Sequence, residues 1–387
     1  MPLASQLTAL SALVATYFAH IGFFNPYLPL WLKETGMSLV TISLLVSLQS
    51  ASRLVAPYAW GWVSDRTGRR SWLLRYAALA SLALSLGLWL DGGFVGLFVV
   101  LLLLFCHTSG MMPMSEALLA QLLSREGSLD TRRYGRVRVL GSIGFLVTVI
   151  AAGWWFERAG MSQFPMITCI TLAAVALSAW CLPSIRDRAA DPATQASVLP
   201  LLQQRAIQLF FASTFFHVLS HIGIYVFFSL YLDELGYSKT MIGLMWALSV
   251  LVEVVWFFTQ SRWLAGARLG LWLVICAGIM TVRMAMTAAA ADVLWILVLA
   301  QALHAITFAA HHTVCIAWLA RHFPGALRGR GQALYTVIAY GLTGVLGGVI
   351  GGLVSSHWGL VTVFWLCVPV ALLGMITAWG VWRLERA

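Results

Sequence analysis

The sequence predicts a membrane protein made of helices, and its composition supports this fold class in two ways. Hydrophobic residues form 60% of the 387-residue chain, whereas Asp, Glu, Lys and Arg form only 10%. A soluble domain carries about 25% charged residues. The apolar residues also lie in long runs, such as 97–105 and 337–354, that contain no charge. A water-soluble enzyme, a nucleic-acid-binding protein and a secreted disulfide scaffold are therefore disfavoured.

The chain length fits twelve spans, because one helix needs about 20 apolar residues to cross a bilayer. The longest polar break follows the sixth span. We therefore expect two six-helix domains, residues 1–183 and 205–387, joined by a cytoplasmic linker at 184–204. The expected spans are 7–31, 38–62, 72–90, 94–122, 137–157, 163–182, 206–231, 239–260, 269–289, 292–319, 331–354 and 359–382.

The distribution of basic residues predicts the orientation of the chain. Of the 24 Lys and Arg residues, nineteen fall in or beside the even-numbered loops or at the C-terminus, whereas the odd-numbered loops hold Lys33, Arg158 and Lys239. Cationic residues collect on the cytoplasmic side of membrane proteins. We therefore expect a multi-pass protein of the cell inner membrane with both termini in the cytoplasm. The net charge of +10 reflects this topology and does not indicate a nucleic-acid partner.

An internal repeat relates the two halves. Residues 28–53 align without gaps onto residues 228–253, with eight identical positions of 26. Self-similarity at a fixed offset indicates a duplicated architecture, and two parallel six-span halves are typical of secondary transporters. The alignment places Arg53 opposite Glu253, and both are charges within apolar runs.

The loop between spans two and three contains a motif that Gly61, Asp65, Arg66, Gly68, Arg69 and Arg70 define. Glycines permit a tight turn and a close approach of helices, and Asp65 can sit at a helix N-terminus, where the dipole favours an anion. The segment resembles the G-x-x-x-D-R-x-G-R-[RK] signature of the major facilitator superfamily, in which this loop controls conformational gating. The alternative is a simple inside-positive loop.

Further segments resemble one branch of that superfamily. Residues 134–141 (YGRVRVLG) and 113–117 (PMSEA) are similar to segments of the oligosaccharide/proton symporters, which include lactose permease. Residues 138–145, Glu116, Glu253 and the histidines resemble the phenylpropionate permease family more closely. The resemblance implies two pseudo-symmetric six-helix bundles and alternating access.

Charges within spans are costly, so they usually face a cavity and have partners. By resemblance, Glu116 and Arg138 bind the substrate. Arginine also suits a carboxylate ligand, because its planar fork binds both oxygens. The alternative is a structural salt bridge that braces spans four and five.

Glu253 in span eight is the expected proton carrier. Burial in an apolar cavity favours the neutral form of a carboxyl group, and protonation removes the cost of burying it when the carrier changes face. The alternative is a permanent ion pair with Arg53, Arg138 or Arg283. We expect Arg53 and Arg283 to be intramembrane charge partners.

Span ten carries His304, His311 and His312, which we expect to assist proton coupling, since histidine titrates near physiological pH. His304 and His311 are seven residues apart and should share a helical face. The segment departs from lactose permease, because Thr307 and Gln301 replace its carboxylate and lysine. The alternative is a set of core histidines.

Spans one and seven carry aromatic stripes that would suit an aromatic acid. His20 lies on span one between Tyr17 and Phe24, and His221 and Tyr225 lie one turn apart on span seven. We expect His20, His221, Tyr225 and His304 to line the substrate cavity, although aromatic residues also form interface belts. Metal binding lacks the required ligand spacing, so no metal is expected.

Glycines 341, 344, 347, 348, 351 and 352 of span eleven follow small-xxx-small spacing, which lets helices pack closely. We expect them, and the pair Gly141 and Gly144 of span five, to form a sliding interface between the halves.

The sequence thus predicts a proton-coupled symporter, not an enzyme, that imports a small organic solute. The resemblance favours an aromatic carboxylate such as a phenylpropionate. A sugar or nucleoside symporter and a drug/proton antiporter are alternatives. The expected partners are the solute, the proton and the lipid bilayer; no cofactor beyond the proton gradient is expected, and the chain is expected to act as a monomer.

Overall fold

The computed structural model describes residues 3–90, 92–125, 128–183, 198–264, 266 and 268–386. Within these ranges, twelve helices or chains of helices are long and apolar enough to cross a membrane. This confirms the predicted fold class and the number of spans. The helices run a few residues beyond the predicted spans: the first covers Ala4–Glu34, where 7–31 was expected.

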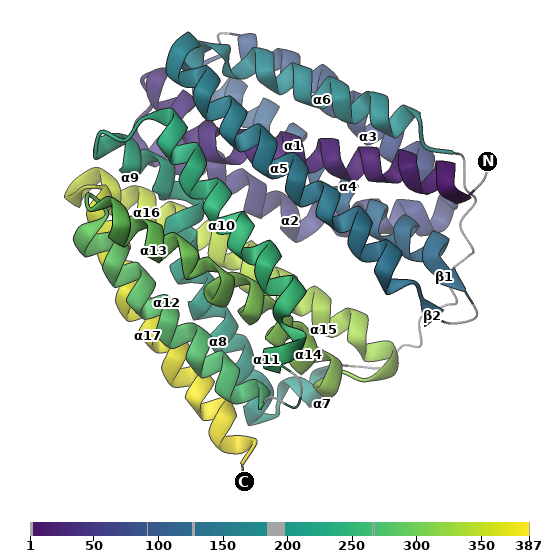
Figure 1. The fold of residues 1–387 in the computed structure, drawn as a ribbon, viewed down its shortest axis with the longest axis vertical. Coiled ribbons are helices and arrows are strands. Elements are labelled where there is room, and N and C mark those ends of the chain that lie inside the picture. The colour runs from purple at the N-terminus through teal and green to yellow at the C-terminus, as the bar shows by residue number, and fades with distance from the viewer. Residues whose placement is uncertain are drawn as a thin grey trace. The chain divides into compact units, whose positions relative to one another are not determined.

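The first six spans are nearly continuous helices (Figure 1). They are α1 (Leu3–Glu34), α2 (Leu39–Thr67), α3 (Arg70–Ser85) with the 3₁₀ turn η1 (Leu86–Trp89), α4 (Gly93–Leu123), α5 (Thr131–Ala159), and α6 (Phe164–Trp180) preceded by the 3₁₀ turn η2 (Met161–Gln163). Two short antiparallel strands, β1 (Ser124–Arg125) and β2 (Ser128–Leu129), separate α4 from α5, where a loop was expected.

Three of the last six spans contain a π-helical turn, in which the backbone accommodates one extra residue. The seventh span is α8 (Arg205–Ile222), η3 (Gly223–Phe227) and α9 (Phe228–Glu234). The tenth is α13 (Leu294–Ala302), η4 (Ala305–Ala310) and α14 (His311–His322), and the eleventh is α15 (Arg328–Tyr335), η6 (Thr336–Leu342) and α16 (Thr343–Trp358). The other elements are α7 (Leu199–Leu202), α10 (Lys239–Thr259), α11 (Ser261–Leu264), α12 (Leu269–Ala290), the 3₁₀ turn η5 (Gly325–Leu327) and α17 (Leu360–Leu384).

The chain forms two compact units that exchange short segments. Unit 1 comprises Met1–Met37, Ala51–Asp191 and Ser238–Ala247, and unit 2 comprises Ser38–Ser50, Pro192–Tyr237 and Leu248–Ala387. The helices α2 and α10 therefore each contribute to both units. The domain boundaries 1–183 and 205–387 remain a prediction, and residues 184–197 of the predicted linker lie outside the described residues.

The repeat is visible in the turns that follow α1 and α9. Gly36 and Gly236 have φ angles of 84° and 83°, in the left-handed region that glycine adopts without strain. The amide of Met37 donates to Leu32 O over 3.2 Å, and the amide of Tyr237 donates to Leu232 O over 3.0 Å. The two halves thus share the helix-ending turn as well as the sequence pattern.

Glycines bring α1 and α5 together within unit 1, where these helices lie side by side (Figure 1). A Cβ atom on Gly144 would overlap the carbonyl group of Ala15, and one on Gly141 would lie 2.7 Å from the Phe18 ring. The suggestion that Gly141 and Gly144 slide between the halves is therefore wrong, because both face a helix of their own unit.

In unit 2, the glycines of α16 pack against the beginning of α2. A Cβ atom on Gly344, Gly348 or Gly352 would overlap the hydroxyl of Ser50, Ser47 or Ser43, respectively. Small residues thus face small residues at every turn along these two helices, as membrane helices require for close packing. Their predicted role in sliding stays a prediction.

The signature loop turns sharply at Gly68, whose φ is 59°. Asp65 lies in the last turn of α2, which ends at Thr67, and not in the first turn of a helix as the sequence suggested. Its Oδ1 atom lies 3.6 Å from Nη2 of Arg70, the first residue of α3, and this pair ties the two helices together. Arg66 lies over the Trp62 ring, 4.1 Å from its centroid.

Gly61 and Arg69 are the remaining positions of the motif. Nothing lies within 4 Å of a Cβ atom placed on Gly61, so no close helix approach occurs there among the described residues. Arg69 precedes α3 as its N-cap and forms no side-chain cap hydrogen bond. The gating role of the loop remains a prediction.

Replacing Gly144 by Ala should destabilise unit 1, because the new methyl group would meet backbone atoms of α1 that cannot move aside independently. Overpacking of this kind costs about 1–3 kcal/mol. The measurement is thermal unfolding of the purified protein in detergent. Gly135→Ala on the same helix is the control, since nothing lies within 4 Å of its Cβ position. Equal unfolding midpoints for the two variants would show that α1 and α5 do not depend on this contact.

Candidate functional site

A fully buried arginine forms the centre of unit 2. Arg283 on α12 has 0% of its surface exposed. Its Nη1 atom lies 3.1 Å from His221 Nε2, 3.2 Å from His304 Nδ1 and 2.9 Å from Thr307 Oγ1. Its Nη2 atom donates to Gln301 Oε1 over 3.1 Å. The guanidinium is therefore held by neutral acceptors and, within the described part of the chain, by no salt bridge.

These contacts set the protonation pattern of two histidines. A guanidinium has only donors, so His221 Nε2 and His304 Nδ1 must present lone pairs to it. Each ring then carries its proton on the other nitrogen. Either histidine could become an imidazolium only by placing a second proton on the nitrogen that faces Arg283. The arginine thus favours the neutral form of both rings.

Glu253 on α10 joins this cluster through His304. Its Oε2 atom lies 3.6 Å from Nε2 of His304, the nitrogen that carries the proton in the pattern above. The side chain is 23% exposed, against 7% for His304. One turn earlier on α10, Ser249 donates to Gln301 Oε1 over 2.7 Å. Glu253 is the carboxylate of the cluster, and it is separated from the arginine by one imidazole ring.

The π-helical turns η3 and η4 lie beside this cluster. The first begins two residues after His221, and the second occupies the whole interval between His304 and His311. Turns of this kind occur often at functional sites.

The π-helical turn η4 separates His304 from His311. The rings of His304 and Phe308 stack at 5.0 Å, and those of Phe308 and His312 at 6.3 Å. His311 instead stacks on His217 at 3.7 Å, and its ring nitrogens lie 3.6 and 3.8 Å from Cys315 Sγ. Both rings lie toward α8, because His304 lies 5.5 Å from the His221 ring and His311 stacks on His217, one turn away from His221 on the same helix. The common face of His304 and His311 stays a prediction.

Several buried donors around the cluster have no acceptor within the described residues. They are Nε of Arg283 and Nε2 of Gln301; the buried Nδ1 atom of His217 also lacks a partner. His217 uses its Nε2 atom to contact Thr307 O at 2.7 Å. Buried polar groups are normally hydrogen-bonded, so unused donors mark places where a water or a ligand oxygen would bind. The ring of Tyr225 stacks on that of His221, with 4.9 Å between the ring centroids.

The second group of predicted residues lies in unit 1. Arg138 on α5 and Glu116 on α4 form a salt bridge of 2.8 Å, with side chains 41% and 27% exposed. The Tyr134 hydroxyl donates to the other oxygen of Glu116, and the Arg138 guanidinium lies over the Phe18 ring at 5.3 Å. An aromatic ring, an arginine and an acid thus meet at a partly open position.

His20 and Arg53 lie elsewhere in unit 1. His20 is buried, contacts the Thr171 hydroxyl through Nδ1 at 3.0 Å, and packs against Phe24 at 5.0 Å. Arg53 is half-buried on α2. Arg53 forms no salt bridge with another described residue. The predicted roles of both residues remain predictions.

The sequence does not single out Gln301, Ser249 and Tyr134, which contact the predicted residues or one another. Gln301 and Thr307 were noted only as departures from a relative, yet both bind Arg283. Ser249 lies four residues before Glu253 and therefore on the same helical face, a signal that was available. Among the described residues, no group of three or more His, Cys, Asp or Glu side chains could hold a metal ion.

The tautomers provide a direct test of the Arg283 cluster. We expect His221 to carry its proton on Nδ1 and His304 on Nε2, with both rings neutral near pH 7. Nitrogen NMR of histidine-labelled protein distinguishes the two tautomers from each other and from imidazolium, and His→Gln variants assign the signals. The exposed His357 serves as the reference. Finding His304 as an imidazolium at neutral pH would contradict the arrangement.

Comparisons with known proteins agree with this architecture. A "Probable 3-phenylpropionic acid transporter" of Escherichia coli (strain K12) is 27% identical over 93% of this chain and 94% of its own length. The maltose permease of Geobacillus stearothermophilus is 26% identical over 93% of this chain and 91% of its own. A crystal structure of a mutant of the nucleoside transporter NupG superposes with a TM-score of 0.85 at 16% identity, covering 97% of this chain and 99% of that one.

These relatives are transporters and not enzymes. The sequence profile of the MFS_1 like family matches residues 7–366, which is most of the 387-residue chain. The twelve spans and the duplicated turns fit that assignment. The chain therefore belongs to the MFS_1 like family and is a membrane transporter of the major facilitator superfamily.

Proposed function

We propose that this transporter is a proton symporter that imports a small aromatic carboxylate, such as a phenylpropionate, across the cell inner membrane by alternating access. In this proposal both termini are cytoplasmic and a monomer is the working unit. The observation that carries the proposal is the position of Glu253, a carboxylate that contacts His304, which in turn contacts the buried Arg283.

The proton role is assigned to Glu253 by elimination within its cluster. Arg283 does not lose its proton in proteins, and its contacts hold His221 and His304 neutral. Glu253 is therefore the group whose charge can change without breaking the cluster. In this scheme the Nε2–H of His304 faces the ionised carboxylate at 3.6 Å and positions it electrostatically. His311 and His312 remain candidates to assist the coupling.

The substrate role is assigned to Arg138. Its guanidinium is 41% exposed and pairs with Glu116, while the Phe18 ring lies beneath it. A carboxylate ligand would compete with Glu116 for the arginine, and an aromatic ring on that ligand would find Phe18. Glu116 would then remain held by Tyr134. Charge-assisted bonds between arginine and a carboxylate are the strong ones.

Specific observations also favour two other functions. A sugar or nucleoside symporter is favoured by the maltose permease relative and the NupG neighbour, and the Glu116–Tyr134 pair could bind a hydroxyl. A drug/proton antiporter would use Glu116 as a cation site. The relative named for 3-phenylpropionic acid and the arginine beside an aromatic ring favour the carboxylate.

Glu253→Gln should abolish substrate accumulation driven by a pH gradient, because the amide cannot exchange a proton. Substrate exchange across the membrane without a gradient should persist, since the amide mimics a protonated acid. Uptake and counterflow in proteoliposomes measure the two activities. Glu234→Gln, an exposed acid on α9, is the control. Full accumulation by Glu253→Gln would remove Glu253 from the coupling scheme.

Arg138→Ala should weaken binding of 3-phenylpropionate by about 10- to 100-fold, the loss expected for a hydrogen-bonded charge. Arg136→Ala, two residues earlier on the same helix and exposed, should bind normally. Ligand-dependent thermal stabilisation measures binding, with lactose and uridine in the same panel. Stabilisation by lactose or uridine, with none by 3-phenylpropionate, would favour the sugar or nucleoside alternative.

A further inference from the structure

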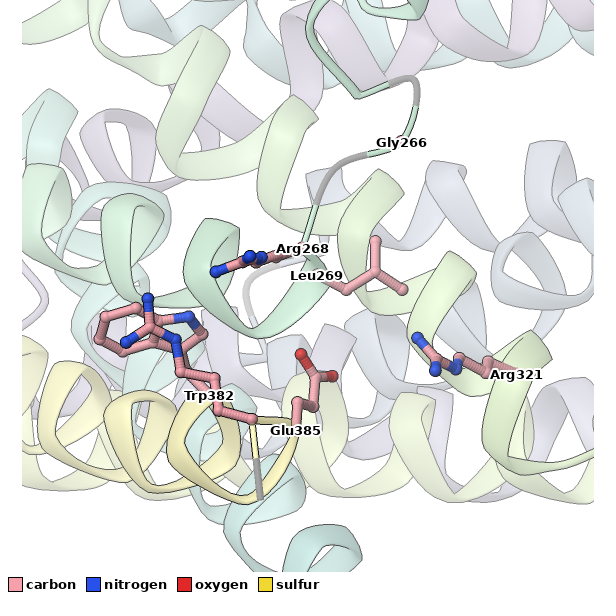
Figure 2. A pocket seen from close by; sticks show the side chains of 7 residues that line it. Gly266, Arg268, Leu269, Arg321, Trp382 and Glu385 are labelled. Atoms are coloured by element: carbon pink, nitrogen blue, oxygen red, sulfur yellow. The ribbon is translucent and has the colours of Figure 1, made fainter.

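A recess in unit 2 gathers positive charge at the ends of three spans. It has a volume of about 610 Å³ and is lined by Gly266, Arg268, Leu269, Arg321, Trp382, Glu385 and Arg386. Figure 2 shows that Arg268, Arg321 and Glu385 come from the beginning of α12, the last turn of α14 and the end of α17. None of these residues belongs to the proposed transport site.

The single acid of the recess does not neutralise its arginines. Glu385 Oε1 accepts from Trp318 Nε1 over 2.9 Å, and Oε2 accepts from the Gly270 amide over 2.9 Å. No salt bridge joins Glu385 to an arginine within the described residues. Three arginines and one acid leave the lining with two excess positive charges. All three guanidiniums are therefore available to an anion.

One residue that lines the recess carries an unpartnered donor, and the lining includes apolar side chains. The Nε1 atom of Trp382 is buried and has no hydrogen-bond partner among the described residues. Arg386 lies over the Trp382 ring, 4.0 Å from its centroid, and Leu269 lines the same space. Arginines bind phosphate oxygens in pairs through their planar fork. The combination suits a phosphate group that carries an apolar neighbour.

The position of the recess decides between sources of phosphate. The spans Leu269–Ala290, Leu294–His322 and Leu360–Leu384 all have one end at this recess, and span ends lie at the level of lipid headgroups. Basic pockets between transmembrane helices bind anionic headgroups. We propose that this recess binds the phosphodiester of an anionic phospholipid, on the cytoplasmic side if the proposed topology holds.

Native mass spectrometry of the purified protein tests the proposal. With phosphatidylglycerol, Arg268→Gln/Arg321→Gln should lose about 30-fold in apparent affinity, at about 1 kcal/mol per basic residue. The control Arg262→Gln/Arg383→Gln removes the same charge from exposed residues that do not line the recess. An equal loss in both double variants would indicate diffuse surface charge and overturn the proposal.

A second pair of variants tests the indole donor without changing charge. Trp382→Phe keeps a ring but removes Nε1–H, and should weaken phosphatidylglycerol binding several-fold; Trp379→Phe is the control. Phosphatidylcholine and inorganic phosphate are the other two ligand arms. Equal retention of phosphatidylcholine by the wild type would overturn an anion site, and binding of inorganic phosphate with no preference for phosphatidylglycerol would overturn the lipid assignment.

Discussion

The burial of Arg283 is the constraint that the rest of unit 2 satisfies. A guanidinium with no exposed surface must find acceptors for its donors. The sequence supplies them from two spans: His221 on the seventh, and Gln301, His304 and Thr307 on the tenth. Because these acceptors are neutral, the cluster keeps its positive charge, and the ionisation state of Glu253 decides whether that charge is compensated.

The π-helical turns follow from the same requirement. Thr307 lies inside η4 and uses its hydroxyl oxygen to accept from Arg283 and its carbonyl to contact His217. Inserting one residue into the helix lets His304 and Thr307 reach the arginine while His311 packs against His217. The irregular backbone thus serves the polar cluster, and its cost is offset by the contacts that it permits.

The fold was predictable because its signals are long and redundant. Twelve apolar runs and the repeated turns at Gly36 and Gly236 can be recognised without any knowledge of side-chain contacts. The candidate site was predictable in part: the Glu116–Arg138 pair was expected and is a salt bridge. The partners of Arg283 were not, since a π-helical turn has no simple sequence signature. The exchange of α2 and α10 segments between units likewise depends on packing that a hydropathy pattern does not contain.

The two units use arginine in opposite ways, and the difference suggests how a proton and an anion would be coupled. In unit 1, Arg138 is paired with an acid and partly exposed, so a ligand carboxylate can compete for it. In unit 2, Arg283 is enclosed, and Glu253 is the acid that the described residues bring to its cluster. In the proposed scheme, a protonated Glu253 would leave the positive charge of Arg283 without a carboxylate near it, and an anion close to that cluster would offset the charge. The proposed coupling of a proton to a monocarboxylate rests on this balance of charge.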